Sequence, residues 1–207
     1  QNEASAGQQR MKMLAEIMRL RRACCHPQLV MPESNISSSK LNAFSNIVEE
    51  LLDNKHKALV FSQFVGHLDI IRKHLDQQGI HYQYLDGSTP AKKRQKAVND
   101  FQNGQGDLFL ISLKAGGSGL NLTAADYVIH MDPWWNPAVE DQASDRAHRM
   151  GQKRPVTIYR LVVQGTIEDK IVQMHKQKRD LANNLLEGTG GSGAISLEEM
   201  MNLIKEV

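Results

Sequence analysis

The chain has 207 residues, of which 41% are hydrophobic and 23% are charged, so it can bury one substantial core and is predicted to be a globular protein. Its formal net charge of +2 is too small to predict a nucleic-acid partner, which has to be argued from local clusters instead. No apolar run reaches the length of a membrane span, which excludes a membrane protein.

The two cysteines, Cys24 and Cys25, are adjacent in the sequence. With His26 they lack the second ligand pair that a zinc site needs, so we expect structural thiols in a reducing compartment and no metal site. The first residues show neither a signal-peptide pattern nor an initiating Met. We therefore expect a cytosolic or nuclear fragment, cytoplasmic in a prokaryote or nuclear in a eukaryote.

Residues 1–54 are predicted to be a helical segment ahead of the main domain. Residues 1–8 are polar and expected to fray, and a helix is predicted from about Arg10 to Ala23, where His26-Pro27 follows and ends it. Its Met-bearing apolar stripe is typical of a core or docking surface. A serine-rich loop then provides the N-cap of a second helix over 40–53.

Short apolar runs alternate with helical patterns over residues 55–164. The runs are Ala58–Phe61, Tyr82–Leu85, Leu108–Ile111, Tyr127–His130 and Thr157–Val162, and the helical patterns cover 65–78, 90–101, 115–120 and 137–150. This alternation predicts an α/β fold, an open parallel sheet with helices on both faces. Ligands of such sheets bind beyond the carboxyl ends of the strands, so the loops after the runs are the candidate functional segments.

The loop after the second run predicts an anion-binding surface. Thr89 is expected to cap the next helix, with Pro90 at its first position. Cations in the opening turns oppose the helix dipole, so an external anion such as a nucleic-acid backbone explains them better than helix stability does. A solvated basic face is the alternative. These cations are Lys92, Lys93, Arg94 and Lys96.

The loop after the third run is rich in glycine. Gly116, Gly117 and Gly119 allow backbone amides to approach a phosphate, while Ser112 and Lys114 add a hydroxyl and a cation. The loop does not fit a dinucleotide fingerprint, because a leucine stands at the third glycine position. The chain also has no Gly-Lys and no Asp-Glu dipeptide, so it contains neither a P-loop nor the usual magnesium-holding acidic box.

The segment 140–152 contains the candidate catalytic residues. If it is helical, Gln142, Arg146 and Arg149 project from one stripe. A pair of guanidiniums suits the charge that develops on a transferring phosphoryl group. The alternative is that Asp141 and Asp145 pair with the arginines.

Two further patterns complete the chain. Trp134-Trp135 lies between two prolines, which predicts a structured loop with Trp134 as a packing anchor. Residues 165–187 predict a helix capped by Thr166, with Asp169 reaching back. Residues 188–207 predict a glycine linker and a short helix over 196–204, capped by Ser196 with Glu199 at the reciprocal position. The long helix has its apolar side at Ile167, Ile171, Met174, Leu181 and Leu185.

Four segments resemble, in order, the successive motifs of the second motor lobe of Swi/Snf-type ATPases, the double-stranded-DNA translocase branch of the superfamily-two helicases. The resemblance implies a RecA-like lobe that closes on a first lobe, which mainly holds ATP and Mg²⁺. It also implies that Arg146 and Arg149 are arginine fingers, with Gln142 placing one of them or contacting the nucleotide. The four segments are Asp86–Thr89, Ser112–Leu122, Asp132–Pro137 and Gln142–Gln152.

The same resemblance implies ligand contacts in the loops. Gly117, Gly119 and Asn121 would lie near the nucleotide, Trp135 would couple a DNA groove to the ATP site, and residues 165–187 resemble a brace across both lobes. The expected partners are double-stranded DNA, the first lobe and a DNA-bound protein target. An RNA helicase lobe and a non-catalytic α/β nucleic-acid-binding module are the alternatives. The other residues expected at the DNA backbone are Ser62, Gln63, Gly87, Ser88, Lys92, Lys93, Ser112, Lys114 and Ala115.

Overall fold

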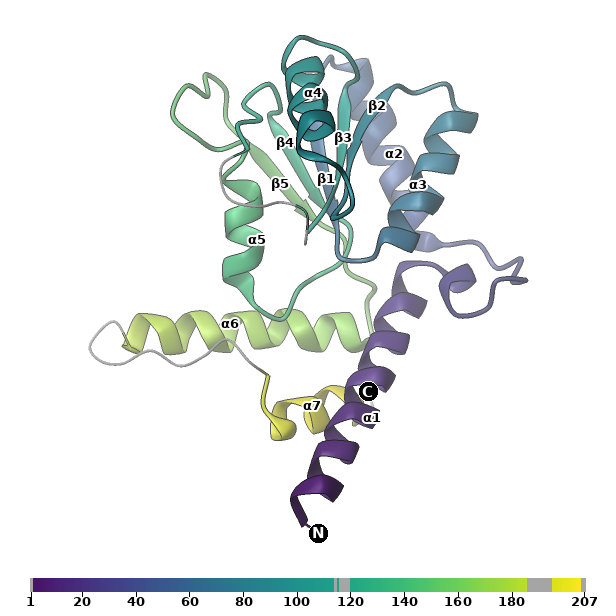
Figure 1. Ribbon diagram of the computed structural model, residues 1–207, viewed down its shortest axis with the longest axis vertical. Helices are drawn as coiled ribbons and strands as arrows, with labels where there is room; N and C mark the ends of the chain where they lie inside the picture. Colours follow the sequence, from purple (N-terminus) through teal and green to yellow (C-terminus); the bar gives the residue numbers. More distant parts are fainter. Residues whose placement is uncertain (1, 114, 116–119, 186–194, 206–207) are drawn as a thin grey trace.

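The computed structural model describes the backbone of residues 2–113, 115, 120–185 and 195–205, and the side chains of 5–113, 115, 120–178 and 195–205. Its centre is a five-stranded sheet in the order β2-β3-β1-β4-β5 (Figure 1). All four strand pairs are parallel, which confirms the predicted open α/β sheet. The strands are β1 Ala58–Ser62, β2 Tyr82–Leu85, β3 Leu108–Ser112, β4 Tyr127–His130 and β5 Thr157–Arg160.

Strand burial follows position in the sheet. The central strands β1 and β3 pair from Ala58 with Leu108 to Ser62 with Ser112, and all of their residues are buried. This is expected of parallel strands that are covered on both faces. The edge strand β5 is mostly exposed and ends at Arg160, two residues earlier than predicted.

Helices cover both faces of the sheet and enclose two separate cores (Figure 1). Val60 points into the core under α2 and α3, whereas Leu59 and Phe61 point into the core under α4 and α5. Alternate residues of one strand therefore serve opposite layers, as strand geometry requires. The helices are α2 Ser39–Asp53, α3 Val65–Gln77, α4 Ala91–Gln102 and α5 Pro137–Ser144.

Three further helices pack on one another beside the sheet (Figure 1). They are α1 (Asn2–Cys25), α6 (Ile167–Leu185) and α7 (Leu197–Ile204). Their shared core contains Ile17 from α1 and Ile171 from α6, both fully buried. The sequence therefore contains a third hydrophobic core that is built from its two ends.

The first helix begins earlier than predicted. Residues 2–8, which were expected to fray, are helical, and α1 starts at Asn2. The side chains of residues 5–9 are exposed, so packing against other elements does not explain this early start. Arg10 Nη2 donates a hydrogen bond to the Ile195 carbonyl at 3.0 Å, which ties this half of α1 to the chain just before α7.

The predicted caps of α2, α6 and α7 are confirmed. The Ser38 hydroxyl accepts the Leu41 N–H at 3.1 Å, and Ser196 and Glu199 form a reciprocal capping box. The Thr166 hydroxyl accepts the N–H of Glu168 at 3.2 Å. The side chains of the predicted apolar residues Leu181 and Leu185 lie outside the described residues. The predicted glycine linker, which begins at residue 188, also lies outside them up to residue 194.

The predicted cap of α4 is wrong. Pro90 is the N-cap residue, in an extended conformation and without a side-chain cap bond. The Thr89 hydroxyl instead accepts the N–H of Asp86 at 3.0 Å, which closes the preceding turn. Local closure of the loop has therefore taken the hydroxyl that the sequence pattern assigned to the helix.

The helix predicted over 137–150 is also shorter than expected. α5 ends at Ser144, and residues 145–151 form successive turns. Leu122 N–H donates to the Arg146 carbonyl at 3.0 Å, and the Gln152 amide donates to the carbonyl of Ala125 at 2.8 Å. These bonds to a distant loop compete with the helical ones, so the chain folds back instead of continuing the helix.

In the part of the chain that the structure describes, every helix is too short or too polar to span a bilayer.

Candidate functional site

A buried carboxylate, Asp132, joins the segments that follow β1 and β4. Its Oδ1 accepts the Ser62 hydroxyl at 2.5 Å. Its Oδ2 accepts the backbone N–H of Gln63 at 3.3 Å and the side-chain amide at 3.0 Å. A buried carboxylate needs such donors. The side chains of Ser62 and Gln63, which were expected at a DNA backbone, are thus buried and hold this junction together.

The tryptophan loop is anchored by an arginine from α1. Trp134 and Trp135 stack with their ring centroids 4.5 Å apart, and the guanidinium carbon of Arg21 lies 5.2 and 4.9 Å from the two centroids. Arg21 Nη2 also donates to the Pro133 carbonyl at 3.1 Å. Since Arg21 is only 1% exposed, its cation–π contacts act in a desolvated environment where they are strongest.

Two ion pairs fix the elements on either side of this loop. Lys40 Nζ lies 2.7 Å from both carboxylate oxygens of Glu168, and both side chains are 1% exposed. Burial raises the pKa of Glu168, and the charge of Lys40 offsets part of this effect. Glu140 accepts a bond from Arg160 at 2.9 Å and another from the Trp134 N–H at 3.0 Å.

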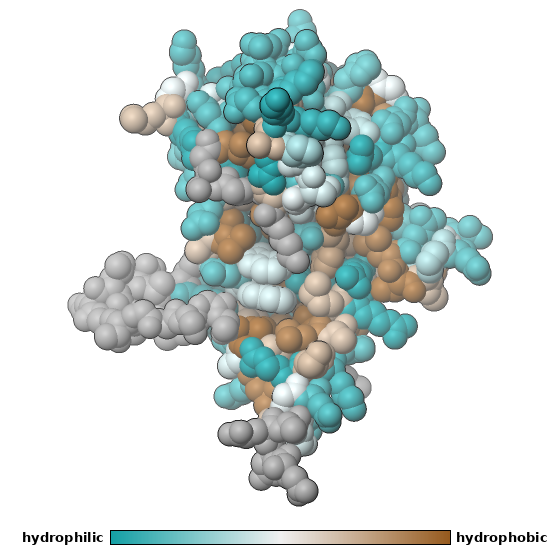
Figure 2. Space-filling model, viewed as in Figure 1, coloured by the Kyte–Doolittle hydropathy of each residue, from teal (hydrophilic) through white to brown (hydrophobic). Residues whose placement is uncertain are grey.

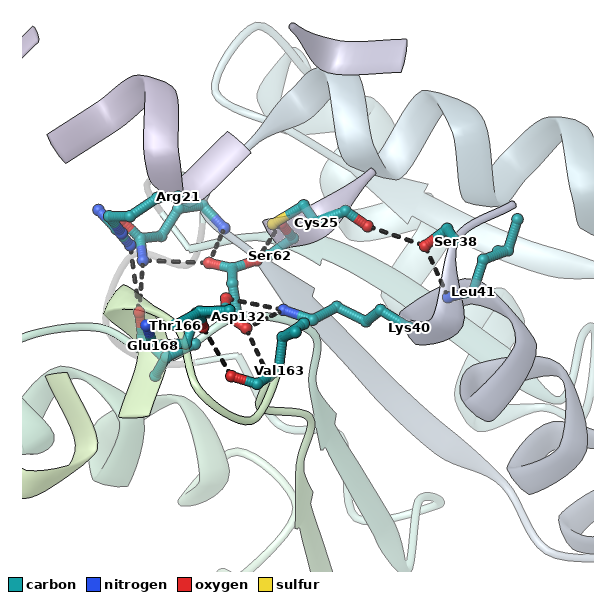
Figure 3. A network of polar contacts seen from close by, with 12 residues as sticks. Arg21, Cys25, Ser38, Lys40, Leu41, Ser62, Asp132, Val163, Thr166 and Glu168 are labelled. Atoms are coloured by element: carbon teal, nitrogen blue, oxygen red, sulfur yellow. Dashed lines mark hydrogen bonds and ion pairs between the residues drawn. The ribbon is translucent and has the colours of Figure 1, made fainter. Parts of the chain in front are cut away.

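Figure 3 shows Arg21, Lys40, Asp132 and Glu168 in one network of polar contacts. It brings together α1, α2, the end of β4 and the start of α6. Residues from the first 54 positions thus share a buried network with the tryptophan loop and with α6.

The candidate catalytic residues differ in environment. Arg146 is 7% exposed, its Nη1 donates to the Gln142 carbonyl at 2.9 Å, and its guanidinium carbon lies 5.9 Å from the Phe61 centroid. Burial, followed by the nearby charge of Arg149, lowers the pKa of Arg146. Gln142 and Arg149 are exposed. The expectation of one helical stripe is wrong, because α5 ends before both arginines.

The predicted nucleotide residues are only partly described. Asn121 is exposed, and the neighbouring Leu122 is hydrogen-bonded to the carbonyl of Arg146. The structure therefore brings this loop and the arginine segment together. Gly117, Gly119 and Lys114 lie outside the described residues, as does most of the helix predicted over 115–120.

The loop after β2 is organised by Asp86. Its carboxylate accepts the backbone N–H of Ser88 at 2.8 Å and the Ser88 hydroxyl at 2.6 Å, and the Tyr84 hydroxyl at 2.8 Å. These bonds to the ionised form lower the pKa of Asp86. Gly87 and Ser88 themselves are exposed at the tip of the loop.

The four cations of α4 divide into two kinds. Arg94 Nη1 donates to the Ala115 carbonyl at 2.8 Å and its Nε donates to the Thr89 carbonyl at 3.1 Å. Lys96 pairs with Asp100 at 2.6 Å. The prediction of an external anion is therefore corrected for these two, which have partners within the chain. Lys92 and Lys93 are exposed, on a hydrophilic surface that Figure 2 shows around α4.

Ser112 and Ala115 are buried at the end of β3. Ser112 is 2% exposed and stands opposite Ser62 in the sheet. Ala115 is 1% exposed, and its N–H donates to the Ser112 carbonyl at 2.9 Å. Both were expected at a DNA backbone, but the structure buries their side chains.

Sequence reasoning assigned no role at the site to four of the charged residues that hold it together. They carry no local motif, because each meets its partner over a long separation, for example Arg21 with Pro133 and Lys40 with Glu168. A charged residue at a helix position that should be buried is the one signal that was available. These four residues are Arg21, Lys40, Glu140 and Glu168.

The fold and the site together define an α/β lobe of the RecA-like type, with basic side chains at the carboxyl edge of a parallel sheet. Residues 39–151 match the family described as the helicase conserved C-terminal domain. The chain is 38% identical over 201 residues to an ATP-dependent helicase of Mycoplasma genitalium, covering 94% of this chain and 19% of that protein. It therefore spans about a fifth of that relative's length.

Solved structures agree. The C-terminal domain of the Swi2/Snf2 ATPase of Sulfolobus solfataricus superposes with a TM-score of 0.72 at 32% identity, covering 94% of this chain and 81% of that one. The core of the same ATPase in complex with double-stranded DNA gives 0.73 at 33% identity, covering 94% and 42%. The chain belongs to the helicase C-terminal domain family, in its Swi2/Snf2 branch.

Proposed function

We propose that this chain is the C-terminal motor lobe of an ATP-dependent double-stranded-DNA translocase or remodeller. The observation that carries the proposal is the arginine segment, in which Arg146 is buried against the sheet while Arg149 and Gln142 are exposed beside it. A buried, anchored guanidinium next to an exposed one is a preorganised cationic surface. Such a surface stabilises charge that develops on a phosphoryl group in transfer.

The residues of this lobe suit one half of a nucleotide site. Guanidiniums bind phosphate oxygens and repel Mg²⁺, so the metal and the P-loop belong to a partner lobe. Closure of the two lobes would bring Arg146 and Arg149 to the nucleotide, with Asn121 beside them. Closure and opening in each cycle then drive movement along DNA.

The DNA contacts are proposed for the exposed residues of the loops. Lys92 and Lys93 supply charge, and Gly87 and Ser88 supply a loop tip that can approach the backbone. Lys114, predicted from the sequence, adds a further cation. The side chains of Ser62, Gln63, Ser112 and Ala115 are buried, so we do not propose them as DNA contacts.

Trp135 is proposed to couple the DNA surface to the arginine segment. It stacks on Trp134 and Arg21 and packs against the core shared by α1, α6 and α7. A shift of the tryptophan loop would therefore be transmitted to α6, in keeping with a brace role for that helix.

ATP turnover by the parent protein tests the proposal. We expect double-stranded DNA to stimulate turnover and single-stranded RNA to leave it near its basal rate, while the 207-residue chain alone shows none above a buffer control. Stimulation by RNA in place of DNA would support the RNA helicase alternative. DNA binding without turnover in the parent protein would support the non-catalytic module.

A further inference from the structure

A cysteine, a histidine and a carboxylate meet in the buried interior between α1, α3 and β4. Cys25 is the last residue of α1, His67 lies in the first turn of α3, and Asp132 follows β4. Their exposed fractions are 0%, 0% and 1%. One sulfur, one ring nitrogen and one carboxylate oxygen lie within 4.8 Å of one another.

His67 carries an unmet requirement in this cluster. Among the described residues, neither of its ring nitrogens has a hydrogen-bond partner. A fully buried imidazole without partners is uncommon and calls for a specific explanation, such as a bound ion. The neighbouring His26 is not the partner, since its Nδ1 accepts the Gln28 N–H at 3.1 Å.

We propose that Cys25, His67 and Asp132 bind a Zn²⁺ ion. Three atoms within 4.8 Å of one another have a common point no farther than about 2.8 Å from each, and zinc bonds measure about 2.0–2.3 Å. Shifts of about 0.5–0.8 Å per side chain therefore complete the geometry. Thiolate, imidazole and carboxylate together favour Zn²⁺ over Mg²⁺ or Ca²⁺. The fourth tetrahedral position is left for a water molecule.

The surrounding hydrogen bonds suit this ligand set. Asp132 already accepts bonds from Ser62 and Gln63, which orient the carboxylate as outer-shell donors do in zinc sites. Neither ring nitrogen of His67 is engaged by another described residue, so one of them can supply the lone pair that a metal needs. Zinc binding releases the proton of the Cys25 thiol.

Two cations and two carboxylates surround the proposed site, so the charges around it are balanced. The cations Arg21 and Lys40 act on this cluster, and Asp132 and Glu168 carry two negative charges. A bound ion would tie α1 and α3 to the tryptophan loop, because its three ligands come from these segments.

The test is metal content after the apo chain is equilibrated with Zn²⁺ and freed of excess metal. We expect one zinc per wild-type chain and the same in Cys24→Ser, whose neighbouring thiol is the matched control. Cys25→Ser and His67→Ala should lose the ion. No zinc in wild type, or equal zinc in His67→Ala, would overturn the proposal.

A second measurement is independent of how the variants fold. Replacement of Zn²⁺ by Co²⁺ in the wild-type chain should produce a thiolate-to-cobalt absorption band together with the visible bands of a tetrahedral site. A cobalt spectrum without the thiolate band would contradict the assignment of Cys25. Neither readout depends on ATP or DNA, so this proposal stands or falls separately from the proposed function.

Discussion

Residues only three positions apart can have opposite environments, as Arg146 and Arg149 do. Arg146 is 7% exposed and donates to the carbonyl of Gln142, whereas Arg149 is exposed. The turns after α5 cause this difference, because they direct one side chain to the sheet and the other to the surface. A substitution of Arg146 therefore affects packing as well as charge, and Arg149 gives the cleaner test of catalysis.

Arg149→Ala in the parent protein is expected to lower ATP turnover by about 10³–10⁵-fold, the range seen when an arginine finger is removed. The nucleotide Kd should change little, because the interaction strengthens only in the transition state. The thermal midpoint should stay the same, since the side chain is exposed. Steady-state turnover and nucleotide titration measure these effects.

The matched control is Lys153→Ala, an exposed cation of the following loop, which should keep wild-type turnover. A parallel loss of nucleotide binding in Arg149→Ala would instead show that this arginine holds the ground state. Arg146→Ala should lower turnover as strongly, with an added loss of stability.

Lys92 and Lys93 are expected to contact DNA phosphates. The double variant Lys92→Ala/Lys93→Ala should weaken duplex binding and reduce the slope of log K against log salt by about 0.9 for each lost phosphate contact. Lys96→Ala is the control on the same helix, because Lys96 already pairs with Asp100. Titrations at several salt concentrations measure the slope. An equal change of slope in Lys96→Ala would mean that the effect comes from the net charge of the protein and not from phosphate contacts of Lys92 and Lys93.

At the scale of elements, α2 and α6 are joined by the buried pair of Lys40 and Glu168. Its two partners are 128 positions apart, so the pair links the helical segment before the sheet to the helix after it. Breaking a buried pair by removing one partner typically costs about 3–5 kcal/mol, because an uncompensated charge remains. The pair thus resists separation of α6 from the lobe.

Lys40→Met is expected to make stability dependent on pH. Without the lysine, burial raises the pKa of Glu168 further, so the folded state holds a proton that the unfolded state loses above its own pKa near 4.5. The free energy of unfolding of the variant is therefore closest to that of wild type below that pH. It decreases relative to wild type as the pH rises through the pKa of Glu168 in the folded state. Denaturant unfolding at pH 5 and pH 8 should show the deficit growing with pH.

The control for this prediction removes the carboxylate as well. Lys40→Met/Glu168→Gln lacks both members of the ion pair, so the carboxylate can no longer make the deficit depend on pH. A Lys40→Met deficit that does not change with pH would mean that Glu168 keeps its charge through another partner.

At the scale of the whole molecule, the two ends of the chain form one helical body against the carboxyl edge of the sheet (Figure 1). α1, α6 and α7 share a core, and Trp135 packs against it. The tryptophan loop therefore lies between the sheet and this body. The proposed coupling of DNA binding to lobe closure depends on this position.

Much of the fold could be predicted because its signals are local. Alternating apolar runs and helical patterns identified the five strands. The serine-rich loop before α2, and Ser196 before α7, identified two helix starts. The end of α5 could not be predicted, because it depends on Leu122 and Gln152 from other segments. The same holds for Thr89, whose hydroxyl closes a turn instead of capping a helix.

The amino-acid order alone determined the strands, the order of the motifs and the family, since these depend on spacings along one segment. Only the tertiary structure decided which polar residues are buried together. Arg21, Lys40, Asp132 and Glu168 come from distant parts of the chain, and no spacing rule connects them. A buried charge is stable only beside its partner, so its role became visible only when folding had brought the two together.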